Sequence, residues 1–252
     1  GLMGGVRVLV SQATGASDHH AARRFGWQGL WLALPLGVAM SSLSLLPPSI
    51  FHILGATDVI SIYADEFFSI RVLGAPLVLI NIALSAWFQG RGDTKTPMRS
   101  TLFGNAINIG LDPLLIFGWW GFPELGVAGA ATATIISLLV QVIYMSLQIR
   151  PHLRGVSNSI DSSQQAAIWN LGAPIGVRYM LNMGSFVVFS SMITLVGAVE
   201  LAAHIIVVRI CSVSFLPGHA VGEAVGVLVG QFIGANQSQK CRPVVGSALK
   251  LA

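Results

Sequence analysis

Charged residues are scarce in this sequence of 252 residues. Only 10% of the residues are charged, whereas 54% are hydrophobic, and ordinary soluble domains carry about 25% charged residues. The apolar residues are not confined to one segment, because blocks of about 20 of them alternate with short polar loops along the whole chain. This composition excludes a soluble enzyme and predicts a helical protein that crosses a membrane several times.

The sequence contains only two cysteines and no continuous basic stretch. Cys211 and Cys241 have no metal-ligand spacing and support neither a disulfide framework nor a zinc site. The formal net charge is +4, but the basic residues lie in separate loops and form no patch for nucleic acid. We therefore expect no nucleic-acid partner and interpret the basic residues as topology signals.

The hydrophobic blocks predict six complete spans, at residues 26–46, 67–89, 100–118, 127–149, 167–197 and 202–230. A partial span at 1–11 precedes them and another span begins at residue 244, so we expect the chain to be part of a longer protein. Alternate loops hold nine basic residues: Arg23, Arg24, Arg91, Lys95, Arg99, Arg150, Arg154, Lys240 and Arg242. The other loops hold only acidic charges, at Asp58, Asp65, Glu66, Glu124 and Glu200. By the positive-inside rule, the basic loops face the cytoplasm.

Five of the six predicted spans contain an interior proline: Pro35, Pro76, Pro113, Pro174 and Pro217. Each proline lacks a backbone N–H donor and leaves the carbonyl four residues earlier without its helical partner. We expect kinked helices whose freed carbonyls bind neighbouring groups or water. Such prolines fit ordinary tolerance in membrane helices or helices broken around a polar path. The remaining span, at 127–149, begins with small residues that allow another helix to approach closely.

One segment of the chain recurs. Residues 8–16 (VLVSQATGA) match residues 227–235 (VLVGQFIGA), and extension of both copies to Arg23 and Arg242 gives seven identities in sixteen positions at an offset of 219. Each copy ends a span at a basic loop, and the offset covers an even number of spans, so both copies cross the membrane in the same direction. Two six-helix halves related by an axis along the membrane normal satisfy this pattern and enclose a central path.

Asp112 is the residue whose position most needs an explanation. It lies near the middle of its predicted span, where an ionised carboxylate costs at least about 2.5 kcal/mol. Asn105, Asn108 and Asp112 are spaced to share one helical face. Pro113 leaves the carbonyl of Ile109 without its donor one turn away. These acceptors suit a proton, a sodium ion or a hydrated cation, and the same groups also suit hydrogen bonds to neighbouring helices.

Other polar side chains within the predicted spans have either a structural or a functional interpretation. Glu223 follows the break at Pro217 and is a candidate second titrating group. For the arginines we favour ion pairing, or snorkelling to the span ends; they are Arg7, Arg71, Arg178 and Arg209. Thr132 and Thr134 either bond to the backbone of their own helix or face the polar stripe.

Catalytic motifs are weak. Gly184-Ser185 lacks the further glycine and the suitably placed histidine of an intramembrane serine protease, and no phosphate-binding loop or metal-binding histidine pair is evident. We expect no enzymatic activity. A polytopic membrane enzyme is the least favoured alternative, because it needs two or more catalytic groups at one level of the membrane.

Five stretches of the chain, in order, carry a resemblance to a known family: residues 10–16 (VSQATGA), 89–97 (QGRGDTKTP), 105–112 (NAINIGLD), 126–134 (GVAGAATAT) and 201–204 (LAAH). They resemble the multidrug and toxic compound extrusion (MATE) family of secondary transporters. Residues 68–76 (FSIRVLGAP) and Arg178 are most similar to its DNA-damage-inducible-F-like branch.

The resemblance implies an all-α fold, a polytopic transmembrane helical bundle with two six-helix lobes in the full-length parent. Roughly helices 2 (part) to 8 are present here, with the start of helix nine. On this mapping residues 1–150 belong to the amino-terminal lobe, 151–166 form a cytoplasmic linker, and 167–252 begin the carboxy-terminal lobe.

The resemblance also implies roles for individual residues. Asn108 and Asp112 match the cation site on the family's fifth helix, and Thr134 matches its sixth-helix threonine; Asn105 joins them as a candidate. The first helix, whose aspartate completes that site, is absent from this chain. Some members carry a glutamate on the seventh helix, where this sequence has Arg178 and Asn182 and no acid.

We therefore expect a transporter that exports small organic, often cationic compounds by alternating access, in exchange for H+ or Na+. Na+ at Asp112 is the candidate metal ion, and no cofactor is expected. A lipid-linked-precursor flippase of the same superfamily is the runner-up, because Arg7, Arg71 and Arg178 would suit its cationic path. We expect a monomer surrounded by lipid in the plasma (inner) membrane.

Overall fold

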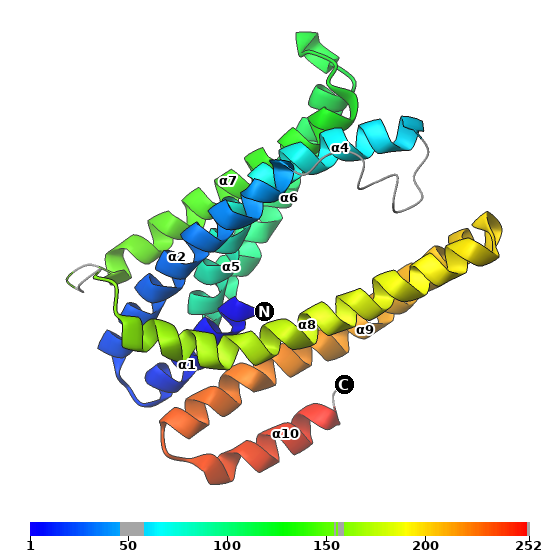
Figure 1. Ribbon diagram of the computed structural model, residues 1–252. Helices are drawn as coiled ribbons and strands as arrows, with labels where there is room; N and C mark the ends of the chain where they lie inside the picture. Colours follow the sequence, from blue (N-terminus) through cyan, green and yellow to red (C-terminus); the bar gives the residue numbers. More distant parts are fainter. Residues whose placement is uncertain (46–57, 154, 156–158, 251–252) are drawn as a thin grey trace. The chain divides into compact units, whose positions relative to one another are not determined.

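The computed structural model describes residues 1–45, 58–153, 155 and 159–250. Every regular element in those ranges is a helix (Figure 1). The α-helices are α1 (Leu2–Gly15), α2 (His19–Ser41), α4 (Asp58–Leu73), α5 (Ala75–Gly90), α6 (Lys95–Ile116), α7 (Gly126–Leu153), α8 (Ser162–Val196), α9 (Ala198–Gly234) and α10 (Cys241–Leu249). Short 3-10 helices cover Ser42–Leu45, Trp119–Gly121 and Ser238–Lys240. Arg154, part of the predicted linker and the last residue of the predicted span 26–46 lie outside the described residues.

Several helices are long and apolar enough to cross a membrane. Within the described part of the chain there are four: His19–Leu45, Gly126–Leu153, Ser162–Val196 and Val199–Gly234. A fifth results if Ser61–Leu73 and Ala75–Gly90, which are bent by 50°, form one span. α6 has 22 residues and covers residues 100–116 of the predicted span 100–118, but its polar residues reduce its apolar character. The all-helical membrane fold predicted from the composition is confirmed.

The bend between α4 and α5 has a visible cause. Pro76 has no N–H, so the carbonyl of Val72 cannot receive the usual helical hydrogen bond. The Ser41 hydroxyl on α2 lies 3.1 Å from that carbonyl oxygen and also 3.1 Å from the carbonyl oxygen of Gly37. The expectation that a neighbouring group satisfies a carbonyl freed by proline is confirmed at this position. The other four prolines lie inside continuous helices.

The helices group into two compact units, and each is described by itself. One unit contains most of α2 together with α4, α5, α6 and α7. The other contains α1, α8, α9 and α10, with residues 90–92. This grouping places α1 with α8 and α9, whereas chain order assigns it to the predicted amino-terminal lobe. The division into lobes at 1–150 and 167–252 concerns the full-length protein and stays a prediction.

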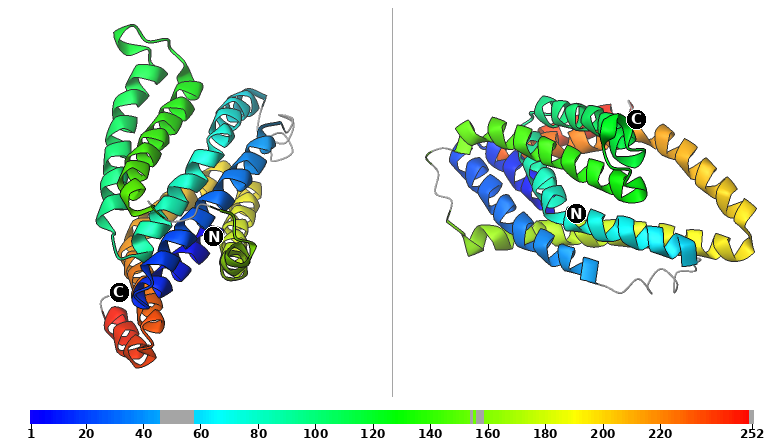
Figure 2. Two further views of the ribbon diagram at one scale, coloured as in Figure 1. Left: turned by 90° about the vertical axis from the view of Figure 1, so that its left-hand side faces the viewer. Right: turned by 90° about the horizontal axis from the view of Figure 1, so that it is seen from above.

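In the unit of α2 and α4–α7, α7 packs against α6 and α4 and is hydrogen-bonded to α5. Figure 2 shows α6 and α7 side by side, joined as an antiparallel hairpin. A Cβ atom at Gly129 of α7 would overlap with the Leu115 carbonyl of α6, so glycine is needed where these helices cross. Gln141 is buried and accepts a hydrogen bond from Asn81 on α5 (3.2 Å). The small-residue segment predicted at 127–134 thus serves as a packing surface.

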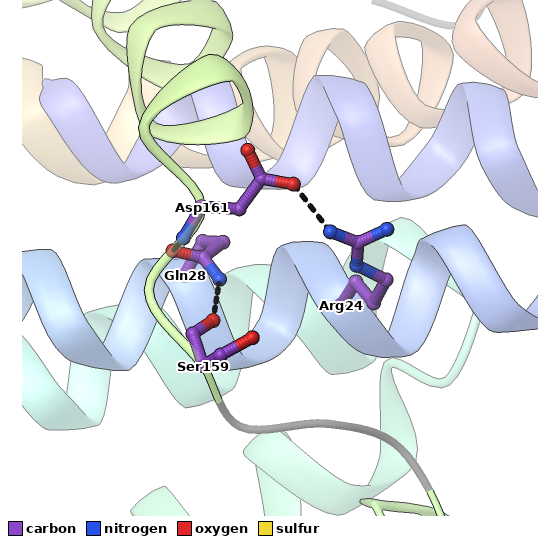
Figure 3. Close-up of polar contacts among 4 residues, drawn as sticks. All are labelled: Arg24, Gln28, Ser159 and Asp161. Atoms are coloured by element: carbon purple, nitrogen blue, oxygen red, sulfur yellow. Dashed lines mark hydrogen bonds and ion pairs between the residues drawn. The ribbon is translucent and has the colours of Figure 1, made fainter.

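The segment before α8 is attached to α2 (Figure 3). Gln28, which is 1% exposed, donates from Nε2 to the Ser159 carbonyl (2.8 Å) and accepts from the Asp161 N–H (3.2 Å). Arg24, one turn earlier, pairs with the Asp161 carboxylate. The amide of Gln28 therefore replaces backbone partners that residues 159–161 would have in a helix.

Candidate functional site

The predicted polar stripe lies on one face of α6. Asn108 donates from Nδ2 to Oδ1 of Asp112 (3.4 Å), and both side chains are half-buried. The buried residues of α6 include Ser100, Gly104 and Leu115, and at 100° per residue the stripe lies beside this buried face. Asn105 is exposed. The structure therefore brings Asn108 and Asp112 together and leaves Asn105 outside that contact.

Thr134 is engaged within its own helix. Its hydroxyl donates to the Ala130 carbonyl (2.9 Å), and Thr132 makes the same type of bond to Ala128 (2.8 Å). Bonding to the backbone of their own helix was one of the two arrangements predicted for these threonines. A threonine oxygen in such a bond still has lone pairs for a cation. The role of Thr134 as a ligand stays a prediction.

The chemistry around Asp112 is that of a single carboxylate with amide neighbours. In the part of the chain that the structure describes, no group of three or more His, Cys, Asp or Glu side chains could hold a metal ion. A cation at this place would rely on the Asp112 carboxylate, the Asn108 amide oxygen and backbone carbonyls, which are ligands for hard cations. Pro113 lies inside α6 and has no N–H to donate to the Ile109 carbonyl.

A hollow of about 470 Å³ lies on another side of α6. It is lined by Ile107, Gly110, Leu111, Pro113 and Leu114, and by Trp119 and Trp120 after the helix. This lining is apolar and does not include Asp112 or Asn108. The hollow is therefore separate from the candidate cation site.

Glu223 of α9 forms an ion pair with Arg7 of α1. Both side chains are partly accessible, at 32% and 25% exposure. Ion pairing, the favoured reading for the arginines, is confirmed for Arg7. Arg178 lies over the ring of Tyr179, with 5.5 Å from its guanidinium carbon to the ring centroid, and Arg178 and Arg209 are exposed.

The two copies of the repeat end their helices in the same way. Ala16 N–H bonds to the Gln12 carbonyl and Ala235 N–H to the Gln231 carbonyl, both at 2.9 Å. The next residue has a left-handed backbone in each copy, with φ of 59° at Ser17 and 57° at Asn236. Equivalent residues of the repeat thus adopt equivalent caps.

The two copies also contact each other reciprocally. A Cβ atom at Gly15 would overlap with the Gln231 carbonyl, and one at Gly234 would overlap with the Gln12 carbonyl. Exchange of the copies turns each contact into the other, as at an interface with two-fold symmetry. Earlier along both helices Arg7 pairs with Glu223, so the contacts follow the same order and α1 and α9 run in the same direction, as the repeat predicts. The matching glycines and glutamines of the two copies are evident in the sequence, but the sequence does not show that the two copies contact each other.

Comparison with known proteins identifies the family. The MatE family matches residues 1–114 and 174–252. The chain belongs to the MatE family. The "Probable multidrug resistance protein NorM" of Thermotoga maritima is 31% identical over 96% of this chain and 53% of its own length. The "Probable multidrug resistance protein YoeA" of Bacillus subtilis is 27% identical over 97% of this chain and 55% of its own length.

A solved structure gives the same fold. This chain superposes on the outward-facing conformation of a multidrug resistance MATE family transporter with a TM-score of 0.89. The match covers 100% of this chain and 56% of the transporter, at 23% identity. This MatE chain spans about half the length of the curated relatives that it matches. The family resemblance is confirmed, and the chain is a multi-pass integral membrane protein. The similarity to the DNA-damage-inducible-F-like branch stays a prediction.

Proposed function

We propose that the full-length protein is a cation-coupled exporter of organic compounds that works by alternating access. The observation that carries the proposal is the MatE match, which includes the segment of Asn108 and Asp112. The relatives that match along the chain are named as probable multidrug resistance proteins. We propose the plasma membrane as its location, a monomer as the working form, and small organic, often cationic molecules as substrates.

Asp112 is the proposed coupling residue. Its carboxylate lies within a predicted membrane span and accepts a hydrogen bond from Asn108. Proton or Na+ binding neutralises a charge that is costly at this depth. Asn105 and Thr134 are proposed as supporting polar groups, and an aspartate on the helix missing from this chain would complete the site.

Coupling requires that the ion binds the two conformations with different affinity. A ligand with equal affinity for both states shifts neither, and a shift from 1:99 to 99:1 needs about 5.5 kcal/mol of differential affinity. Neutralisation of Asp112 provides such a difference if only one state leaves the carboxylate without other polar partners. We propose H+ or Na+ as the ion, since one carboxylate with amide oxygens suits both.

The exporter is favoured over a lipid-linked-precursor flippase. The case for the flippase depends on a path lined by cationic side chains. Arg7, one of the three arginines on which it was based, is neutralised by Glu223. We assign no catalytic reaction to the protein.

The proposal is tested with Asp112→Asn in the full-length protein, reconstituted in vesicles with an imposed H+ or Na+ gradient. The amide keeps the size and the contact with Asn108 but cannot change its charge, so we expect gradient-driven export to fall at least about tenfold while insertion is retained. Asp65→Asn, outside the predicted spans, is the matched control and should export at the parental rate. Parental export by Asp112→Asn would show that this residue is structural.

A further inference from the structure

The Arg7–Glu223 pair connects two helices deep in the membrane. Arg7 precedes the end of α1 by eight residues, and Glu223 precedes the end of α9 by eleven. At 1.5 Å per residue these positions lie about 12 and 16 Å from the predicted cytoplasmic ends. The hydrocarbon core is about 30 Å thick, so the pair lies near its middle. Charges at this depth are rare and mark functional positions.

The helix crossing itself does not require this ion pair. In the numbering of the repeat, the residue equivalent to Arg7 is Gly226, and the residue equivalent to Glu223 is Gly4. A Cβ atom at Gly4 would meet the side chain of Ile175 on α8, so the equivalent positions carry no charge and form no matching α1–α9 contact. A Cβ atom at Gly226 would meet no atom within 4 Å, so close packing does not explain glycine there. The repeat therefore has no second ion pair at the equivalent positions, and the Arg7–Glu223 contact breaks its symmetry.

A tight contact between the ends of both helices lies on the predicted cytoplasmic side of the pair. Gly15 and Gly234 touch the backbone of the opposite helix, and a Cβ atom at Gly230 would overlap with the Ser11 hydroxyl. α1 and α9 are therefore in direct contact at the ends that the charge pattern places on the cytoplasmic side. By chain order, α1 belongs to the predicted amino-terminal lobe and α9 to the carboxy-terminal lobe.

We propose that the Arg7–Glu223 ion pair is a latch that keeps the cytoplasmic side of the transport path closed. This inference rests on the proposed alternating-access function, because a path between the two lobes opens to the cytoplasm only when α1 and α9 separate at these ends. The pair attracts strongly in a medium of low dielectric constant. Separation of the helices would leave each charge unpaired at a depth where an unpaired charge is costly, so the pair favours the closed arrangement.

The latch is tested by the distance between α1 and α9 in the full-length protein. Spin labels are attached to Ala16→Cys and Ser238→Cys, two exposed positions after α1 and α9, in a background whose other cysteines are replaced by serine. Pulsed electron resonance gives the populations of short and long distances without substrate or gradient. In the Arg7→Gln, Glu223→Gln double variant no lone charge remains, and we expect the long-distance population to rise about tenfold relative to the short one, within the range of measured pair couplings.

Two further variants keep the test decisive. Arg7→Lys retains the charge but loses the planar fork of the guanidinium, and we expect a smaller increase, of about threefold. Arg209→Gln removes an exposed arginine of α9 and should leave the distances unchanged. If the double variant folds with parental distances, or if it does not accumulate and Arg7→Lys has parental distances, the latch is refuted. The measurement does not depend on export, so failure of the Asp112 proposal is distinguishable from failure of the latch.

Discussion

The hydrogen bond between Ser41 and the Val72 carbonyl offers a sharp test of how this protein tolerates a bent helix. Ser41→Ala leaves the carbonyl freed by Pro76 without its described partner. Hydrogen bonds between membrane helices contribute about 0.6 kcal/mol on average and up to about 1.7 kcal/mol. Because the alternative here is an unsatisfied carbonyl, we expect Ser41→Ala to lower the free energy of unfolding by about 1 kcal/mol.

The same reasoning predicts that the effect depends on Pro76. In Pro76→Ala the N–H of residue 76 becomes available to the Val72 carbonyl, so Ser41 is no longer its necessary partner. Ser41→Ala should then lower the free energy of unfolding by about 0.3 kcal/mol or less, and the double-mutant cycle should give a coupling of roughly 0.7 kcal/mol.

The free energies are measured by unfolding of the full-length protein in mixed micelles with increasing denaturing detergent. Ser42→Ala is the matched control, because the exposed Ser42 hydroxyl bonds only to the Ala39 carbonyl within its own turn; its effect should stay within about 0.5 kcal/mol. Additive effects of Ser41→Ala and Pro76→Ala would refute the idea that the serine compensates for the proline.

Three other predictions concern the repeat, the linker and the topology. Gly15→Ala and Gly234→Ala should each lower the free energy of unfolding by about 2 kcal/mol in the same assay. Gly110→Ala, where no atom lies near the added Cβ, is the control and should be neutral or stabilising. Sensitivity at only one of the two repeat positions would contradict their equivalence. Gln28→Ala removes both hydrogen bonds to residues 159–161 and should speed proteolytic cleavage of the linker at least about fivefold. Gln148→Ala, at an exposed position, should leave the cleavage rate unchanged. An unchanged rate in Gln28→Ala would show that Gln28 does not hold the linker. Cysteines at Ser17 and Thr94 should be labelled from the cytoplasm and one at Glu124 from the opposite side, and labelling of Thr94 and Glu124 from one side would mean that α6 does not cross the membrane.

Much of the helical architecture could be predicted because the signals are local. A run of apolar residues or a proline acts on its own segment, so the helices and the break before Pro76 follow from short stretches of sequence. The contact of Asn108 with Asp112 was predictable for the same reason, since residues one turn apart on a helix are neighbours.

The remaining contacts join residues far apart in the chain. Nothing near Arg7 indicates that its partner is Glu223, because four arginines and two acids within the predicted spans allow many pairings. The attachment of residues 159–161 to α2 was missed as well. A buried glutamine such as Gln28 is a weak signal in sequence, since its partners are backbone groups that any residue supplies.

α6 is the least apolar of the predicted spans, yet the charge pattern requires it to cross the membrane. Arg91 precedes α6 and Lys95 is its first residue, and Arg150 lies in the last turn of α7. The two helices form a hairpin that is closed by a hydrogen bond from the Leu125 N–H to the Leu115 carbonyl (2.9 Å). If α6 did not cross, α7 alone would place these basic segments on opposite sides, against the positive-inside rule. The residues that reduce the apolar character of α6 are therefore retained in a membrane helix at a free-energy cost, and they include the pair, Asn108 and Asp112, on which the transport proposal depends.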